Sequence, residues 1–277
     1  MATKAKAKPI HSSTMQIRMI DVGGQKLCVG IRRGLADRPP LLLFNGIGAN
    51  LELGRSFIEA LDDTTAIIFD IPGVGGSPAP AFPYRPSTLA RLARNLVREL
   101  GFDKVDVSGV SWGGGLAQQF AFQYPDVCRK LVLAATSAGA IMIPGKPAVL
   151  SKMGSPRRYT DRNYLQSIAP DIYGGTFRRD AGLIIRHASA MKGATRYGYL
   201  LQLLAMVGWT SLPWLWLLRQ PTLIMAGSDD PLVPVANARL LNTMIPNSRL
   251  EILDDGHLFL VTRPRECAEM IEAFLRE

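Results

Sequence analysis

Ser111 lies in the pentapeptide Gly109-Val110-Ser111-Trp112-Gly113, which fits the motif G-x-S-x-G. In this motif the serine occupies a tight turn between a strand and a helix, and glycines remove the side chains that would block such a turn. An apolar run precedes Ser111, and a stretch with helical spacing follows it. A serine held in this way can attack a carbonyl carbon once a base removes its proton. Alone, the motif also fits a structural turn.

The base that such a serine needs is a histidine, and the chain contains three. In the order typical of this motif, an acid and then the histidine follow the serine, each at the end of a later strand. His11 lies near the N-terminus, and His187 precedes the candidate acids. His257 remains, directly after the apolar stretch 249–255, and is the predicted base.

The acid is expected after the preceding apolar run, in the sequence AGSDDPLVP. Asp230 is the favoured candidate because it lies three residues after Gly227. Asp229 remains the alternative, and its other role would be to cap the loop that follows. The acid would fix the tautomer of His257 and stabilise its imidazolium form.

The negative charge that develops on an attacked carbonyl oxygen needs hydrogen-bond donors that are already in place. The first expected donor is the backbone N–H of Trp112, because a helix beginning there points its N–H groups toward the reacting carbonyl. The second is expected in the loop after the run 40–46, from the N–H of Ile47, with that of Gly48 as the alternative. The sequence DIPGVGGSP (70–78) fits neither common phosphate-binding pattern, so a structural turn is favoured there and no cofactor is expected.

Strands that end at one edge of a sheet must hold these residues. Apolar runs of strand length alternate with helical stretches, which is typical of a mostly parallel sheet covered on both faces. The predicted strands are 15–22, 26–32, 40–46, 65–70, 104–111, 130–136, 221–227 and 249–255. The first two are expected to form a hairpin that turns at Gly23-Gly24. The predicted helices are 87–100, 112–125 and 263–277. The fold class is therefore α/β, with eight strands.

The alternation stops between residues 137 and 219, a stretch too long for an unstructured loop. It is rich in glycine, proline, methionine and aromatic residues and shows helical pieces without a clear strand. We expect a helical cap here, called the cap segment below, inserted between the two parts of the core, 14–136 and 220–277. Its three tryptophans are expected to line or cover an apolar entrance, or alternatively to pack the cap onto the core: Trp209, Trp214 and Trp216.

The composition indicates a globular protein with one large core, since the 277 residues are 47% hydrophobic and 20% charged. The net charge is +9, but the basic residues are scattered, so nucleic-acid binding is not expected. The apolar run around Pro213 is well short of the about 20 residues of a membrane span. Residues 1–13 are expected to form a disordered basic tail.

The three cysteines are far apart and show no metal-ligand spacing: Cys28, Cys128 and Cys267. We therefore expect neither a disulfide framework nor a metal site, and a cytoplasmic protein.

Over nearly its whole length the chain resembles the α/β-hydrolase superfamily, and within it the intracellular medium-chain-length poly(3-hydroxyalkanoate) depolymerases. The stretches that carry the likeness are FNGIGANLELG (44–54), FDIPGVGGS (69–77), GVSWGGGLAQQFA (109–121), KLVLAAT (130–136), PGKP (144–147), SPRRY (155–159), IYGGTFRRD (172–180), GWTS (208–211) and DDGHLFL (254–260). Asn45-Gly46 stands where many superfamily members carry His-Gly, and the depolymerase group looks the same there.

The resemblance implies a triad of Ser111, Asp230 and His257 that hydrolyses a stored polyester inside the cell to 3-hydroxyalkanoic acids. The implied partner is the polyester granule surface or a medium-chain ester, and Asn45 is a further candidate for substrate contact. The aromatic residues of the cap segment suggest a homodimer.

Other functions remain open. One is an esterase or lipase for small acyl esters, because a triad does not encode its substrate. Serine-triad C–C hydrolases and perhydrolases are further alternatives within the fold. From another class, a non-catalytic binder of granule or membrane surfaces would use the positive charge and the apolar cap.

Overall fold

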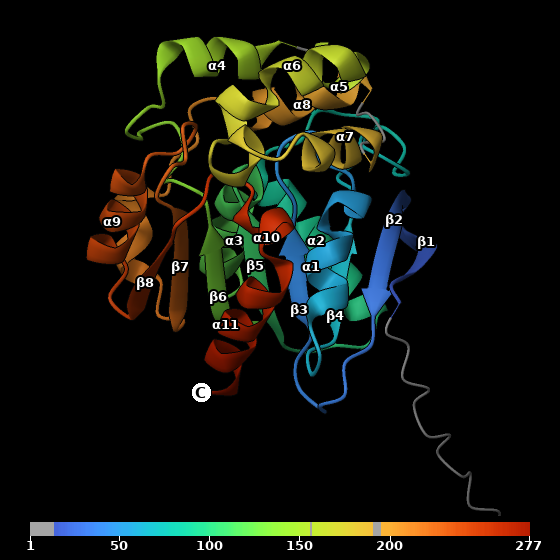
Figure 1. The fold of residues 1–277 in the computed structure, drawn as a ribbon. Helices are drawn as coiled ribbons and strands as arrows, with labels where there is room; N and C mark the ends of the chain where they lie inside the picture. The colour runs from blue at the N-terminus through green and yellow to red at the C-terminus, as the bar shows by residue number, and fades with distance from the viewer. Residues whose placement is uncertain (1–13, 156, 191–194) are drawn as a thin grey trace, which may run out of the picture.

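The structure is a computed structural model that describes residues 14–155, 157–190 and 195–277. The expected tail, residues 1–13, lies outside the described residues. Eight strands form one sheet in the order β1-β2-β4-β3-β5-β6-β7-β8 (Figure 1). The strands are β1 (Gln16–Val22), β2 (Gln25–Arg32), β3 (Leu41–Phe44), β4 (Ala66–Phe69), β5 (Val105–Val110), β6 (Cys128–Ala134), β7 (Thr222–Gly227) and β8 (Ser248–Leu253). The prediction of an eight-stranded α/β fold is confirmed.

The sheet is antiparallel only at its first edge. β1 pairs with β2 and β2 with β4 in antiparallel fashion, whereas β3 to β8 pair in parallel. The predicted hairpin is confirmed, and its turn residues Gly23 and Gly24 have φ values of 61° and 90°. Two consecutive positive φ values suit glycine and match the twist of a tight hairpin. The carboxyl ends of β3 to β8 therefore meet at one edge of the sheet.

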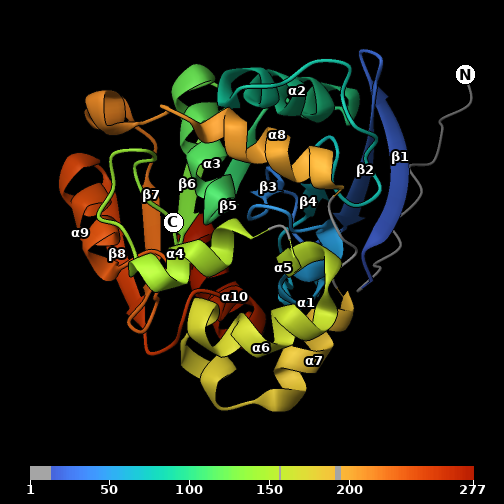
Figure 2. The same cartoon turned by 90° about the horizontal axis from the view of Figure 1, so that it is seen from above.

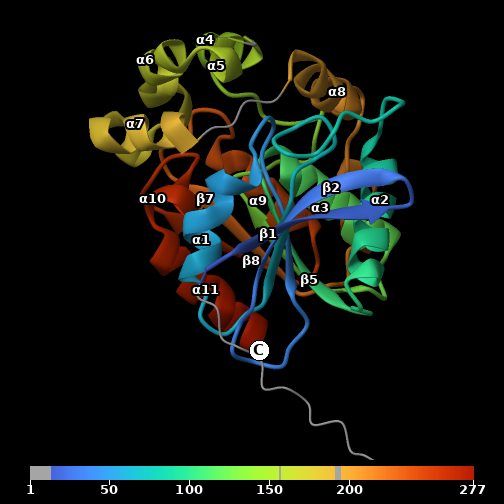
Figure 3. The same ribbon diagram turned by 90° about the vertical axis from the view of Figure 1, so that its right-hand side faces the viewer.

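Helices cover both faces of this sheet (Figure 3). One face carries α1 (Arg55–Ala60), α10 (Phe259–Thr262) and α11 (Pro264–Arg276). The other carries α2 (Pro86–Glu99), α3 (Trp112–Gln123) and α9 (Val235–Met244). Along β3, Leu41 and Leu43 pack on the first face and Leu42 and Phe44 on the second, all almost fully buried. Burial on both faces explains why the strands read as continuous apolar runs.

The cap segment forms helices above the carboxyl edge of the sheet (Figure 1). They are α4 (Pro147–Gly154), α5 (Arg157–Thr160), α6 (Arg162–Tyr173), η2 (Gly175–Arg178), α7 (Ala181–Ala190) and α8 (Arg196–Met206). The segment ends in η3 (Leu212–Leu217), which packs against α3 and α9, and a further short helix, η1 (Leu51–Gly54), follows β3. Seen from above, α6 and α7 lie over the side of α1 and α10, whereas α8 lies over the side of α2 and α3 (Figure 2). The cap segment thus lies on both sides of the edge where β5 ends, with α6 and α7 on one side and α8 on the other.

Candidate active site

Ser111 joins β5 to α3 in a strained backbone conformation. Its φ and ψ are 54° and −119°, a combination that side-chain-bearing residues rarely adopt. Hydrogen bonds hold both backbone groups of Ser111. Its N–H donates to the Ala134 carbonyl (2.9 Å), and its carbonyl accepts from the Thr136 hydroxyl (2.7 Å). The neighbouring strand β6 and the residues after it therefore hold the conformation that projects Ser111 from the sheet edge.

Gly113 lets the start of α3 approach the end of β3. A Cβ atom at this position would lie 2.2 Å from the Phe44 carbonyl oxygen and 2.5 Å from that of Asn45. Both are backbone atoms, so no side chain could move to make room. The glycine that follows Ser111 in the motif is thus required by packing at the turn.

Asp230 and His257 meet at the ends of the neighbouring strands β7 and β8. His257 Nδ1 lies 2.7 Å from Asp230 Oδ2, and both side chains are buried. Asp230 Oδ1 accepts the N–H groups of Leu232 and Val233, each at 2.9 Å. Because Nδ1 faces a carboxylate, we assign the imidazole proton to this nitrogen. That assignment leaves Nε2 as the atom that can accept a proton.

Asp229, the alternative acid, makes different contacts. Its Oδ2 accepts the N–H of Gly175 (2.8 Å), and its carboxylate forms an ion pair with Arg178 (3.0 Å). Both partners belong to the cap segment. In the structure Asp230 therefore contacts His257, whereas Asp229 contacts η2.

Ser111 and His257 line the same pocket. Among the described residues, no hydrogen bond joins the Ser111 hydroxyl to His257. Contacts of this kind often tighten only when substrate binds.

Two pockets meet at Ser111. The first encloses about 740 Å³, including its open mouth, and its walls include Leu53, Phe57 and Leu258. The second, of about 660 Å³ including the open solvent at its mouth, is lined among others by Met142, Met206, Trp209 and Val233. Their largely apolar walls can accommodate a long aliphatic ligand on both sides of the nucleophile.

The two candidate second donors differ in what they contact. The N–H of Gly48 donates to the side-chain oxygen of Gln202 in α8 (2.7 Å). Ile47 lines the first pocket together with Ser111. Trp112 opens α3, and its indole N–H donates to the backbone carbonyl of Gln202 (3.0 Å). The site is therefore compatible with Ile47 and Trp112 as the donor pair.

The predicted substrate-contact residues separate into two groups. Asn45 lines the first pocket, where its side chain donates to the Asn50 carbonyl (2.9 Å), and Trp209 lines the second. Trp214 instead stacks on Phe122 with ring centroids 4.4 Å apart. Trp216 is 60% exposed and lines neither pocket. Of the three tryptophans, the structure brings only Trp209 to Ser111.

The alpha/beta hydrolase fold family matches residues 39–264 of the chain. The chain belongs to this family. This α/β-hydrolase is 54% identical over 261 residues to the poly(3-hydroxyalkanoate) depolymerase of Ectopseudomonas oleovorans, across 94% of this chain and 92% of that protein. It is 27% identical to 3-oxoadipate enol-lactonase 2 of Acinetobacter baylyi, across 88% and 91% of the two chains. The resemblance to the superfamily and to its depolymerases is confirmed.

Solved structures share the fold at lower identity. The enol-lactonase from Burkholderia xenovorans superimposes with a TM-score of 0.81 at 22% identity, covering 94% of this α/β-hydrolase and all of that chain (100%). The esterase from Thermogutta terrifontis gives 0.77 at 24% identity, covering 94% and 98%.

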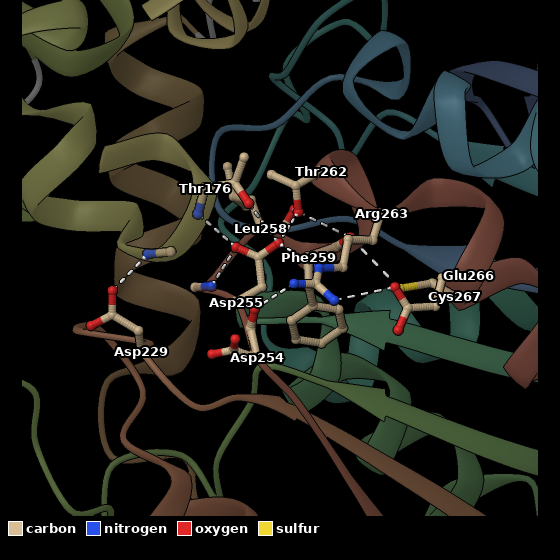
Figure 4. Close-up of polar contacts among 12 residues, drawn as sticks. Thr176, Asp229, Asp254, Asp255, Leu258, Phe259, Thr262, Arg263, Glu266 and Cys267 are labelled. Carbon is tan, nitrogen blue, oxygen red and sulfur yellow. Dashed lines mark hydrogen bonds and ion pairs between the residues drawn. The ribbon is translucent and has the colours of Figure 1, made fainter. Parts of the chain in front are cut away.

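Asp255 is a buried acid that the sequence reasoning missed in this α/β-hydrolase (Figure 4). Its Oδ1 accepts the N–H groups of Thr176 (2.8 Å) and Gly256 (2.7 Å). Its Oδ2 accepts the hydroxyls of Thr262 (2.6 Å) and Thr176 (3.1 Å) and Arg263 Nε (3.2 Å). Burial alone would raise the pKa of Asp255, but the hydrogen bonds from Thr262, Thr176 and Gly256 outweigh it and lower that pKa. A carboxylate with five donors is a structural anchor for the turn that carries the histidine.

The same turn is attached to the cap segment through its backbone. The N–H of His257 donates to the carbonyl of Tyr173 (2.7 Å), the last residue of α6. Together with the contacts of Asp229 and Asp255, this bond fixes residues 173–178 to both loops that carry the triad candidates. The sequence does carry a signal for Asp255, since it directly precedes Gly256-His257. The expectation that the triad acid follows the preceding strand draws attention away from it.

Within the described ranges, no group of three His, Cys, Asp or Glu side chains is arranged to hold a metal ion. No helix among the described residues is long and apolar enough to cross a bilayer.

Proposed function

We propose that this α/β-hydrolase is a serine carboxylester hydrolase that degrades medium-chain-length poly(3-hydroxyalkanoate) to 3-hydroxyalkanoic acids. The observation that carries the proposal is the 54% identity, across 94% of the chain, to a poly(3-hydroxyalkanoate) depolymerase. The site supports it, because a nucleophile candidate lies between two largely apolar pockets. In this proposal the cap segment acts as a lid that supplies pocket walls.

The reaction follows from the groups at the site. His257 Nε2 takes the proton of Ser111 as the serine oxygen attacks an ester carbonyl carbon, and Asp230 stabilises the imidazolium that forms. The N–H groups of Trp112 and Ile47 stabilise the negative charge on the carbonyl oxygen, at about 3 to 4 kcal/mol per donor. The ester C–O bond then breaks, the released alcohol takes the proton from His257, and an acyl-enzyme remains. His257 then removes a proton from a water molecule as that water attacks the acyl-enzyme carbonyl. The bond to the Ser111 oxygen breaks, Ser111 regains its proton from His257, and the acid is released.

We also infer that the protein acts in the cytoplasm on the granule surface, through an exposed apolar face of α8. Leu200, Leu203 and Leu204 are 50%, 39% and 47% exposed, and Val207 just after the helix is 63% exposed. The same helix, α8, carries Gln202, which accepts hydrogen bonds from the Gly48 N–H and from the indole N–H of Trp112. A contiguous apolar face beside a site for a water-insoluble substrate favours contact with that substrate.

The test uses purified medium-chain granules and the variant Ser111→Ala. The wild type should release soluble 3-hydroxyacids, measured by mass spectrometry, and the variant should release none because the nucleophile is absent. p-Nitrophenyl octanoate is assayed in parallel.

Cleavage of the small ester without release from granules would assign a generic esterase and contradict the depolymerase proposal. Wild type that cleaves neither substrate but binds granules would favour a non-catalytic surface binder.

A further inference from the structure

Two polar residues of the cap segment line the pocket beside Ser111. Arg158 of α5 and His187 of α7 line this pocket together with Ser111 and His257. Their exposed fractions are only 3% and 6%, although both side chains are strongly polar. Much of the remaining wall is aliphatic or aromatic. A polar group placed inside an apolar pocket can orient a ligand that carries a matching polar group.

His187 has an unused hydrogen-bonding atom. Its Nδ1 is buried and has no hydrogen-bond partner among the described residues. Tyr173 and Phe177 pack edge-on against its ring, each with centroids 5.3 Å away, and hold its orientation. Burial and, to a smaller extent, the positive charge of Arg158 lower the pKa of His187 to about 4. At neutral pH the ring is therefore uncharged, and a ligand atom could satisfy Nδ1.

Arg158 brings a positive charge to the same wall. Its guanidinium donates to the sulfur of Met153 (2.9 Å). Burial raises the pKa of the hydroxyls of Tyr173 and Tyr199, and Arg158 opposes this increase through its charge and hydrogen bonds. These three neighbours are uncharged groups. A guanidinium beside a neutral imidazole attracts an acceptor oxygen, above all that of a carbonyl or carboxylate group.

We propose that His187 and Arg158 bind the carboxyl oxygen of the repeat unit on the alcohol side of the cleaved ester, an assignment that rests on the function proposed above. In a poly(3-hydroxyalkanoate), every unit carries a carboxyl group three carbons from the ester oxygen. When one ester lies at Ser111, the next carboxyl group is therefore within a few bonds of it. This group is an ester carbonyl inside the chain and a free carboxylate at its end, and a simple acyl ester lacks it.

The experiment compares substrates with and without this group. The substrates are p-nitrophenyl octanoate, the linear dimer of 3-hydroxyoctanoic acid, and the methyl ester of that dimer. His187→Phe keeps the edge-on ring packing but removes the nitrogen. It should lower kcat/KM for the dimer by about 10- to 100-fold, while kcat/KM for p-nitrophenyl octanoate stays within about threefold. A loss restricted to the free acid identifies a chain-end carboxylate as the bound group, and a loss on both dimers identifies an ester carbonyl.

Arg158→Met should show the same selective loss, and Arg157→Met is its matched control because that neighbouring side chain is 64% exposed and pairs with Asp161. Thermal unfolding shows whether each variant folds. If Arg158→Met does not fold, His187→Phe alone tests the inference. Unchanged kcat/KM for both dimers, or an equal loss on all three substrates, would overturn the inference. Wild type that cleaves p-nitrophenyl octanoate but neither dimer would instead contradict the proposed function itself.

Discussion

Asp229 and Asp230 are neighbours in the sequence, yet their side chains serve different parts of the molecule. Asp230 is buried and directs one oxygen to His257 and the other to two backbone N–H groups. Asp229 is half exposed and directs its carboxylate to η2. In the proposed mechanism only the first of these carboxylates stabilises a positive charge during the reaction.

The two aspartates should therefore respond differently to the same substitution. Asp230→Asn should lower kcat for p-nitrophenyl octanoate by about 10³- to 10⁴-fold, because an amide favours the wrong imidazole tautomer and does not stabilise the imidazolium. Asp229→Asn should change kcat by no more than about threefold, since a half-exposed ion pair contributes little. Steady-state kinetics of the two purified variants measures both effects. Equal losses would contradict the assignment of Asp230 as the triad acid.

Site residues could be predicted from the sequence where their order along the chain identifies them. They could not be predicted where folding brings distant segments together. Asp230 and His257 follow successive parallel strands, so their meeting could be predicted. His187 is excluded as the base by its position in the chain, but chain order cannot predict that its helix lines the same pocket as Ser111. Apolar patterning likewise could not tell that Trp216 faces solvent while Trp209 reaches the pocket.

At the scale of elements, the turn between β8 and α10 depends on one buried carboxylate. Asp255 joins this turn to Thr176 in η2 and to Arg263 before α11. The turn carries His257, so its anchor positions the proposed base without touching substrate. Asp255 is therefore a positioning residue.

Asp255→Asn should destabilise the fold by about 2 kcal/mol at pH 7, because hydrogen bonds to the ionised carboxylate are lost. The pKa of Asp255 is lowered in the folded state, so its contribution is present above the unfolded value of about 3.9 and disappears as the pH falls through the folded value. The difference between variant and wild type should thus shrink toward pH 3. Urea unfolding at pH 7 and at lower pH measures it.

Asp254→Asn is the matched control, because Asp254 is exposed and its side chain accepts a 3.3 Å hydrogen bond from the Ser228 hydroxyl. Its unfolding free energy should stay within about 0.5 kcal/mol of wild type. A pH-independent difference for Asp255→Asn would contradict the stated role of its ionised form.

The strands and three of the core helices could be predicted from the sequence, and two other core helices could not. All eight strands and helices α2, α3 and α11 lie close to their predicted positions, because apolar runs mark the strands and apolar residues at helical spacing mark these helices. Helices α1 and α9 were not predicted. α1 has only six residues, too few to show a helical period, and α9 has ten, of which only Asn237, Ala238 and Leu241 are buried.

At the scale of the whole molecule, exposed apolar side chains concentrate in the cap segment. Leu200, Leu203 and Leu204 project from α8, whereas Leu35 is an isolated exposed leucine in the loop between β2 and β3. Isolated apolar residues are common on protein surfaces, but a group on one helix face indicates a contact surface. This distribution underlies the proposed contact with the granule.

The double variant Leu200→Ser/Leu204→Ser should bind granules at least about tenfold more weakly, since each buried leucine contributes about 1.5 to 3 kcal/mol when fully covered. Cosedimentation with granules, in a Ser111→Ala background that prevents turnover, measures binding. Turnover of p-nitrophenyl octanoate by the double variant with Ser111 intact should remain close to wild type.

Leu35→Ser is the control, and its granule binding should not change. Unchanged binding by the double variant would contradict the granule contact. A concentration-dependent dimer in analytical ultracentrifugation that the double variant abolishes would assign this face to a second copy of the chain.

The hydrogen bond from His257 to the Tyr173 carbonyl has a consequence for protein engineering. Exchanging caps between related enzymes is a natural way to transfer substrate preference, and it assumes that the core supplies the chemistry by itself. Here the turn that carries His257 rests on Tyr173 and Thr176, which belong to the exchanged piece. A graft that replaced residues 137–219 without equivalent partners for His257 and Asp255 would bring in a new pocket and leave the base without support. A graft that keeps residues 173–178 of the recipient should preserve turnover while the remaining cap changes the substrate.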